Sequence, residues 1–143
     1  MSGFLLDTNV LSELIKLRPE PTVARWIEAT DETLFFLSVL TLGEIRKGIE
    51  LLSDVRKRIR LEAWLDSELI ARFADRVLPV DLAVTDRWGR IAAQASNRKL
   101  TLPVIDGLLA ATAIQHNKTL VTRNTKDVLA TGVPVFNPWT HNG

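Results

Sequence analysis

The sequence predicts an α/β fold in which a mainly parallel sheet carries helices on both faces. Short apolar segments alternate with longer amphipathic ones along the whole chain, which is the pattern of repeated βαβ units. The apolar segments lack polar alternation, as expected of strands buried on both faces. No repeat, low-complexity stretch or linker divides the 143 residues, so we expect a single domain over residues 1–143.

Local signals give the elements of the first half in order. Residues 4–6 are a continuous apolar run and predict a buried strand. Residues 8–17 carry apolar side chains on one helical face, and two prolines separate this helix from a second one that follows Pro21. The apolar stretch 33–38 predicts the next strand, and a helix is expected over residues 41–52.

The second half continues the alternation. Residues 54–76 predict one long or two short helices, with arginines on one face and leucines and isoleucines on the other. A brief strand at 77–80 suits a sheet edge, because Pro79 has no amide donor. The remaining expected elements are a helix that starts at Asp81 or Thr85 and runs to about residue 97, a helix at 105–116, and strands at 119–122 and 133–136.

The composition excludes several classes of protein. The chain has no cysteine, which excludes disulfides and thiolate chemistry and argues against an oxidising compartment. The apolar run near the N-terminus is too short for a signal peptide or a membrane span, so we expect a cytoplasmic protein. Neither glycine-rich nucleotide loop occurs. A phosphatase of the haloacid dehalogenase type is excluded because Asn9 stands where its second aspartate belongs.

Three acidic residues lie where an apolar strand meets a helix: Asp7, Glu44 and Asp106. Each also has a purely structural interpretation. Asp7 is a good helix N-cap, Glu44 completes a capping box that starts at Thr41, and Asp106 is favoured by the helix dipole in a first turn. Asp106 nevertheless lies on the apolar face of its helix, where an unpaired carboxylate is costly. The carboxyl ends of parallel strands meet at one edge, so we expect the three to converge.

A fourth segment, residues 122–127, follows a strand at the same edge. It offers the amide oxygen of Asn124 and the carboxylate of Asp127, although both residue types also favour turns. Several carboxylates close together repel one another unless a cation compensates them. Oxygen donors without cysteine or a histidine pair select Mg²⁺, or Mn²⁺, over zinc or copper. Such a site activates water and holds phosphate oxygens.

Four ordered stretches resemble the motifs of PIN-domain nucleases. They are the strand that ends in Asp7-Thr8-Asn9, the stretch 38–48 around Glu44, the stretch 106–113 that begins with Asp106, and the stretch 120–127. The closing segment 135–139 is similar to the tail of VapC and FitB-like toxins. The likeness covers nearly the whole chain.

The resemblance implies a PIN-like three-layer fold and a Mg²⁺-dependent endoribonuclease toxin that hydrolyses phosphodiester bonds of single-stranded RNA. It implies that Asp7, Glu44 and Asp106 hold the metal. Where some relatives carry a fourth acid this chain has Asn124, with Asp127 three residues on, and either residue is a candidate to complete the catalytic set.

The resemblance also implies partners. It implies a homodimer that pairs with a small VapB- or FitA-like antitoxin. The tail of such an antitoxin lies across the active site of the toxin, and its other end binds operator DNA. No membrane contact is expected. An alternative function is a catalytically silent PIN-fold module that acts through protein or nucleic-acid contacts, which the missing charge at Asn124 favours.

Phosphate contacts are predicted from basic residues near the motifs: Arg46 and Lys47 beside Glu44, and Arg123 beside Asn124. The basic run 56–60 is interpreted instead as a solvated helix face with Ile59 turned to the core.

Overall fold

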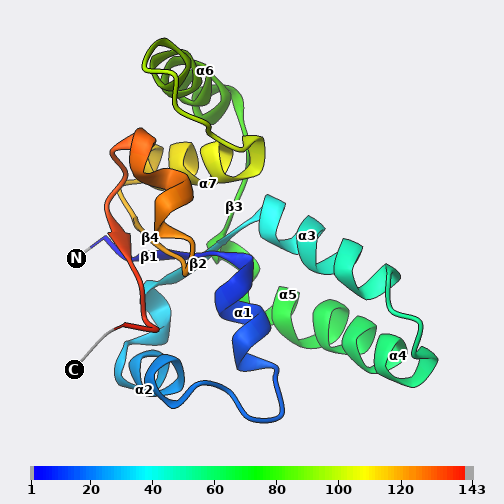
Figure 1. The fold of residues 1–143 in the computed structure, drawn as a ribbon. Helices are drawn as coiled ribbons and strands as arrows, with labels where there is room; N and C mark the ends of the chain where they lie inside the picture. Colours follow the sequence, from blue (N-terminus) through cyan, green and yellow to red (C-terminus); the bar gives the residue numbers. More distant parts are fainter. Residues whose placement is uncertain (1, 141–143) are drawn as a thin grey trace.

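The computed structural model describes residues 2–140, and at its centre lies a five-stranded sheet in the order β3-β2-β1-β4-β5 (Figure 1). All four pairings between neighbouring strands are parallel. The strands are β1 (Phe4–Leu6), β2 (Phe35–Ser38), β3 (Val77–Leu78), β4 (Thr119–Val121) and β5 (Val135–Phe136). The α/β prediction with a parallel sheet is confirmed, and β3 is the edge strand that Pro79 predicts.

The central strand β1 fixes the geometry of the sheet. All three of its residues are buried, and Phe4 is in register with Phe35 of β2 and with Thr119 of β4. An unbroken apolar run is required there because both faces of the strand are covered. Parallel pairing then brings the carboxyl ends of β1, β2 and β4 to one edge, so that Asp7 and Thr122 emerge side by side.

Helices cover both faces of the sheet, as the three-layer prediction requires (Figure 1). On one face, Leu5 packs with Leu109 and Ala110 of α7, and α6 packs outside α7. On the other, Phe4 and Leu6 pack with α1, α2 and α3. The helices are α1 (Thr8–Leu14), α2 (Pro21–Ala29), α3 (Val39–Glu50), α4 (Val55–Ala63), α5 (Ile70–Phe73), α6 (Leu82–Asn97) and α7 (Val104–Gln115).

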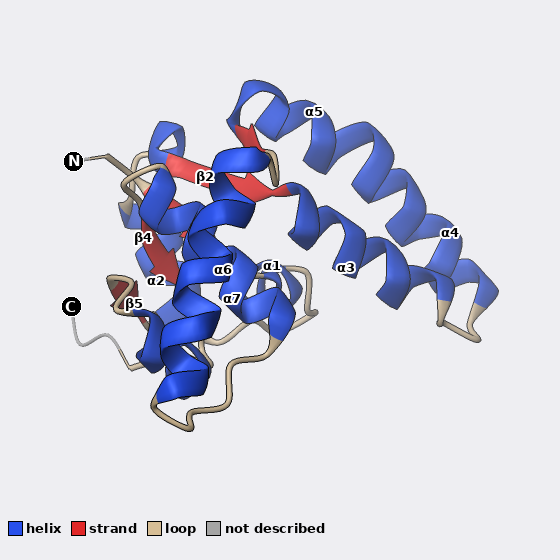
Figure 2. Cartoon of the chain, turned by 90° about the horizontal axis from the view of Figure 1, so that it is seen from above, coloured by secondary structure: helices blue, strands red, loops and turns tan. Residues whose placement is uncertain are grey.

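Helices α3, α4 and α5 form an arm that extends away from the sheet (Figure 2). A π-helical stretch, Trp64–Leu69, joins α4 to α5, so the predicted 54–76 helix is one bent helical segment. The interpretation of Ile59 was wrong: its side chain is 59% exposed. Leu61 and Trp64 occupy the inward face of this segment instead, so the geometry of the arm leaves Ile59 on its open side.

The predicted start of α3 was also wrong. The helix begins at Val39, and its N-cap is Ser38, whose hydroxyl accepts a hydrogen bond from the Leu40 amide at 3.0 Å. Thr41 is therefore already inside the helix, fully buried, and its hydroxyl has no hydrogen-bond partner among the described residues. A capping box from Thr41 to Glu44 does not form, and Glu44 lies in the second turn.

None of the helices in residues 2–140 combines the length and the apolar character that a membrane span requires.

The central strand should dominate stability. Leu5→Ala removes a side chain that is fully buried between sheet and α7, and we expect the free energy of unfolding to fall by about 3 kcal/mol. Leu17→Ala is the matched control, because Leu17 is 99% exposed and should cost less than about 0.5 kcal/mol. Urea denaturation measures both, and equal losses would contradict the placement of β1 at the core.

Candidate active site

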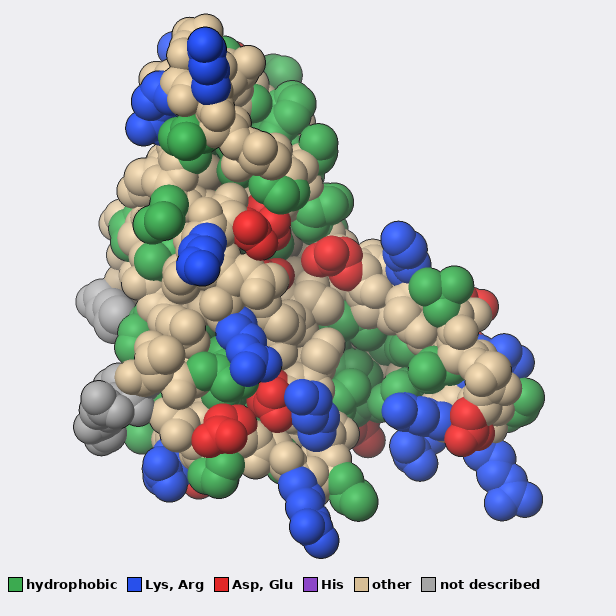
Figure 3. Space-filling view, in the orientation of Figure 1, with side chains coloured by type: hydrophobic (Ala, Val, Ile, Leu, Met, Phe, Trp, Pro, Cys, Tyr) green, Lys and Arg blue, Asp and Glu red, His purple; other side chains and the backbone are tan. Residues whose placement is uncertain are grey.

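Three of the four acidic residues in the motifs converge on one pocket. It has a volume of about 400 Å³ and is lined by Asp7, Thr8, Asn9, Ser12, Glu13, Lys16, Glu44, Asp106, Arg123, Asn124 and Trp139. Acidic side chains gather in the middle of this face of the molecule, with basic ones around them (Figure 3). The pocket lies at the carboxyl edge of the sheet, as the parallel topology predicts.

Asp7 combines the structural and the functional roles. As the N-cap of α1 its Oδ1 accepts a hydrogen bond from the Thr8 amide at 2.7 Å, and its Oδ2 accepts one from the Thr122 hydroxyl at 2.8 Å. Burial raises the pKa of this carboxyl, the two hydrogen bonds oppose that rise, and the charge of Glu44 adds to it. Asp7 is therefore fixed in orientation, with its charge close to that of Glu44.

Glu44 is held from the neighbouring helix. Its Oε1 accepts a hydrogen bond from the Thr8 hydroxyl at 2.7 Å. Thr8 thus contacts both acids, Asp7 through its amide and Glu44 through its hydroxyl. This contact ties α3 to the first turn of α1 and sets the distance across the pocket.

Asp106 lies in the first turn of α7 and has no hydrogen-bond or ion-pair partner among residues 2–140. Its pKa is raised to about 6, first by burial and then by the charges of Asp7, Asp127 and Glu44. Four carboxylates therefore act on one another here, although only three of them line the pocket. The arrangement calls for a cation.

The donor set fits Mg²⁺ better than a metal that needs a closed protein cage. Among the described residues no three Asp, Glu, His or Cys side chains stand close enough to make a ready coordination cluster. Mg²⁺ keeps several of its waters and is commonly held through one or two carboxylates. Hard oxygen donors whose charges lack a cationic partner are suited to such an ion.

Asn124 and Asp127 are the two candidates for the fourth member of the site, and they lie at different places. Asn124 lines the pocket, and its backbone N–H donates to the Thr122 hydroxyl at 3.1 Å. Asp127 lies in the 3-10 helix Thr125–Thr131, outside the lining, but its charge raises the pKa of Asp106. Asn124 thus belongs to the lining of the pocket, whereas Asp127 acts on it only through its charge.

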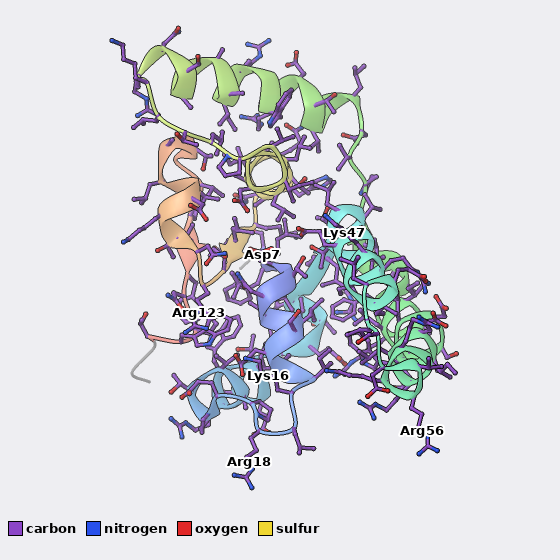
Figure 4. All side chains as sticks on the ribbon, turned by 45° about the vertical axis from the view of Figure 1, so that its right-hand side comes forward. Asp7, Lys16, Arg18, Lys47, Arg56 and Arg123 are labelled. Atoms are coloured by element: carbon purple, nitrogen blue, oxygen red, sulfur yellow. The ribbon has the colours of Figure 1, made fainter. Side chains whose placement is uncertain are left out.

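Of the predicted phosphate contacts, the structure brings one to the pocket. Arg123 lines the pocket. Arg46 instead forms an ion pair with Asp66. Lys47 is exposed on α3, and Figure 4 shows Lys47 and Arg123 on different sides of Asp7. The roles of Arg46 and Lys47 stay predictions.

Several lining residues escaped the sequence analysis as site residues, among them Thr8, Asn9, Glu13 and Lys16. The first two are hydrogen-bonding neighbours of Asp7 in sequence, which was an available signal. Glu13 stands three residues after Val10 on the apolar face of α1, where a charge is unusual. Lys16 and Trp139 carried no signal of their own.

A family comparison agrees with this geometry. The model of the PIN domain matches residues 4–130. The chain belongs to the PIN-domain family. Its PIN-domain relatives include the toxin FitB of Neisseria gonorrhoeae, 37% identical over 94% of this chain and 97% of that protein. They also include the VapC ribonuclease Y4jK of Sinorhizobium fredii, 36% identical over 94% of this chain and 96% of that one.

A solved structure confirms the fold. The chain is similar to FitAB bound to an IR36 DNA fragment, with a TM-score of 0.92, 35% identity and coverage of 98% of both chains. The three-layer PIN-like prediction is therefore confirmed.

The repulsion at Asp106 predicts a measurable effect in the metal-free protein. The folded pKa of about 6 lies above the ordinary value of 3.8, so this group stabilises the fold fully below pH 3.8 and loses that contribution as pH rises through about 6. Asp106→Asn removes the charge and should raise the free energy of unfolding at pH 8 by about 1 kcal/mol, after allowance for solvent screening.

Urea denaturation in EDTA at pH 4 and pH 8 measures this. Asp75→Asn, at an exposed acid outside the pocket, is the control and should change neither value. Lower stability of Asp106→Asn at pH 8 would show that the acids do not repel one another.

Proposed function

We propose that this chain is a Mg²⁺-dependent endoribonuclease toxin that hydrolyses phosphodiester bonds of single-stranded RNA. The observation that carries the proposal is the convergence of Asp7, Glu44 and Asp106 on one pocket at the carboxyl edge of the sheet. The likeness to a protein named VapC ribonuclease over nearly the full length of both chains supports RNA as the substrate.

Each acid has a role that follows from its surroundings. Asp7 and Glu44 are held in place by Thr122 and Thr8, whereas the Asp106 carboxylate has no ion-pair partner among residues 2–140. These three would hold Mg²⁺, which when bound lowers the pKa of a coordinated water and stabilises charge on the phosphate. Asn124 offers an amide to orient water, and Asp127 adds negative charge behind Asp106.

The partners are proposed from the relatives. FitB is named a toxin, and FitAB has been solved bound to DNA. We extend to this chain a small antitoxin that inhibits the nuclease and contacts operator DNA, a homodimeric state and a single PIN domain over residues 1–143. We also propose that it acts in the cytoplasm, where it would meet its RNA substrates.

A catalytically silent binding module is the second candidate. Asn124 brings no charge to the fourth position, which favours this alternative. Against it stands the cost of retaining three mutually repelling carboxylates in one pocket, because a binding module gains nothing from the instability they cause.

A cleavage assay separates the two candidates. With short single-stranded RNA and Mg²⁺, the wild type should cut and EDTA should stop it. Asp106→Asn should lower kcat/KM at least about a hundredfold, because it removes a charged metal ligand. Asp75→Asn serves as the matched control and should cut like the wild type. Equal cleavage by Asp106→Asn would exclude this carboxylate from the reaction, and no cleavage by the wild type across varied RNAs would favour the silent module.

Thr8 tests whether the orientation of Glu44 matters. Thr8→Val keeps the shape of the side chain but leaves Glu44 without the 2.7 Å hydrogen bond. We expect Mg²⁺ affinity, measured by isothermal titration calorimetry, to fall by about tenfold. Thr8→Ser retains the hydroxyl and should bind Mg²⁺ like the wild type. If Thr8→Val and Thr8→Ser bind equally, the hydroxyl does not prepare the site.

A further inference from the structure

Two cations, Lys16 and Arg123, line the acidic pocket. In Figure 4 both lie on the same side of Asp7, while Lys47 lies on another and Arg18 points away from the pocket. The side chains of both cations are exposed to solvent. They therefore form a basic border along one side of a pocket whose interior is acidic.

A buried carboxylate holds Lys16. The Lys16 Nζ donates to Oε1 of Glu13 at 3.0 Å, and the other oxygen of Glu13 accepts the Glu20 amide at 3.1 Å. The Glu13 side chain is only 6% exposed, against 58% for Lys16. The Lys16 hydrogen bond holds the pKa of Glu13 below its usual range, helped by the Glu20 amide and by the Trp139 indole. Glu13 is thus a fixed anion under an exposed cation.

An aromatic ring from the C-terminal segment holds Arg123. Its guanidinium carbon lies 5.2 Å from the centre of the Trp139 ring, within the range of a cation–π interaction. No acid lies within ion-pair distance of Arg123 among the described residues. The donors of its guanidinium therefore stay available for a ligand.

Trp139 is itself held in place. Its amide donates to Oδ1 of Asn137 at 2.9 Å, and its side chain packs against the core cluster that contains Phe4 and Leu6. Its indole also interacts with Glu13. Glu13 therefore holds Lys16, and the Trp139 ring holds Arg123.

We propose that Glu13 and Trp139 are positioning residues, which hold Lys16 and Arg123 at the mouth of the acidic pocket as the cations that bind backbone phosphates of single-stranded RNA. This inference rests on the proposed function. RNA is a polyanion, and the acids repel it unless fixed positive charge lies on its path. The planar fork of Arg123 suits two phosphate oxygens, and Lys16 adds a second point of positive charge.

Steady-state cleavage of a labelled, mixed-sequence single-stranded RNA in Mg²⁺ tests the proposal. Lys16→Ala and Arg123→Ala should each raise KM about fivefold, the loss of one charge-assisted contact, with kcat within about twofold of wild type. Binding of the same RNA to the inactive Asp106→Asn protein should become less dependent on salt in each variant, by one phosphate contact. Arg18→Ala is the matched control and should change none of these values.

The positioning residues give the decisive result. Glu13→Gln and Trp139→Ala should reproduce the rise in KM, and the double variant Trp139→Ala/Arg123→Ala should be no worse than Arg123→Ala alone. Trp139→Phe keeps a ring beside Arg123 and should restore most of the affinity. Its recovery would be a readout that a merely structural role does not give.

Two failures are distinguishable. If the wild type cuts RNA but Trp139→Ala and Glu13→Gln keep its KM and salt dependence, the positioning roles are refuted. If Lys16→Ala and Arg123→Ala behave like Arg18→Ala, the phosphate-binding roles of Lys16 and Arg123 are refuted. These two replace exposed side chains, so they decide the point even if Trp139→Ala does not fold. If the wild type cuts no RNA, the proposed function itself fails.

Discussion

Mutual repulsion among carboxylates at one edge of the sheet is the constraint on which this molecule depends. Parallel pairing of β1, β2 and β4 leaves no choice about where Asp7 emerges, since β1 is central and buried. Glu44 and Asp106 arrive at the same place from helices on opposite sides of the sheet. Within the described part of the chain no ion pair at Asp106 relieves the repulsion. Hydroxyl hydrogen bonds from Thr8 and Thr122 relieve part of it at Glu44 and Asp7.

Those hydroxyls show why structural and functional interpretations of one residue need not compete. Asp7 is a helix cap and also lines the pocket, and its cap hydrogen bond lowers a pKa that burial raises. The cap hydrogen bond holds Oδ1 of Asp7, and the Thr122 hydroxyl holds its Oδ2. Thr8 uses its amide for one acid and its hydroxyl for another, so the first turn of α1 organises two acids with one residue.

The sequence was sufficient for features set by local periodicity and by strand order. Unbroken apolar runs predicted the strands, and the rule that parallel strands end at one edge brought Asp7, Glu44 and Asp106 together. The sequence was insufficient where two local signals competed for the same role. Ser38 and Thr41 are both good N-caps, and only packing of Thr41 in the core selects Ser38. The prediction that Ile59 is buried was wrong for a related reason. Helical periodicity could not show that the arm leaves that face of α4 uncovered.

Contacts between segments that are not adjacent in the sequence could not be predicted, for a further reason. The sequence shows Glu13 on the apolar face of α1, but two of its partners lie in the loop after α1 and in the C-terminal segment. A buried charge is tolerated only when its hydrogen bonds are satisfied, so its presence implies partners that the sequence does not name. The geometry supplies them, and two of them, Lys16 and Trp139, line the same pocket. The pocket places uncompensated negative charges and solvent-exposed positive charges only a few side chains apart. Lys16 pairs with Glu13, whereas Asp106 has no ion pair among the described residues, so the chain fixes a cation without neutralising the charge that attracts a metal.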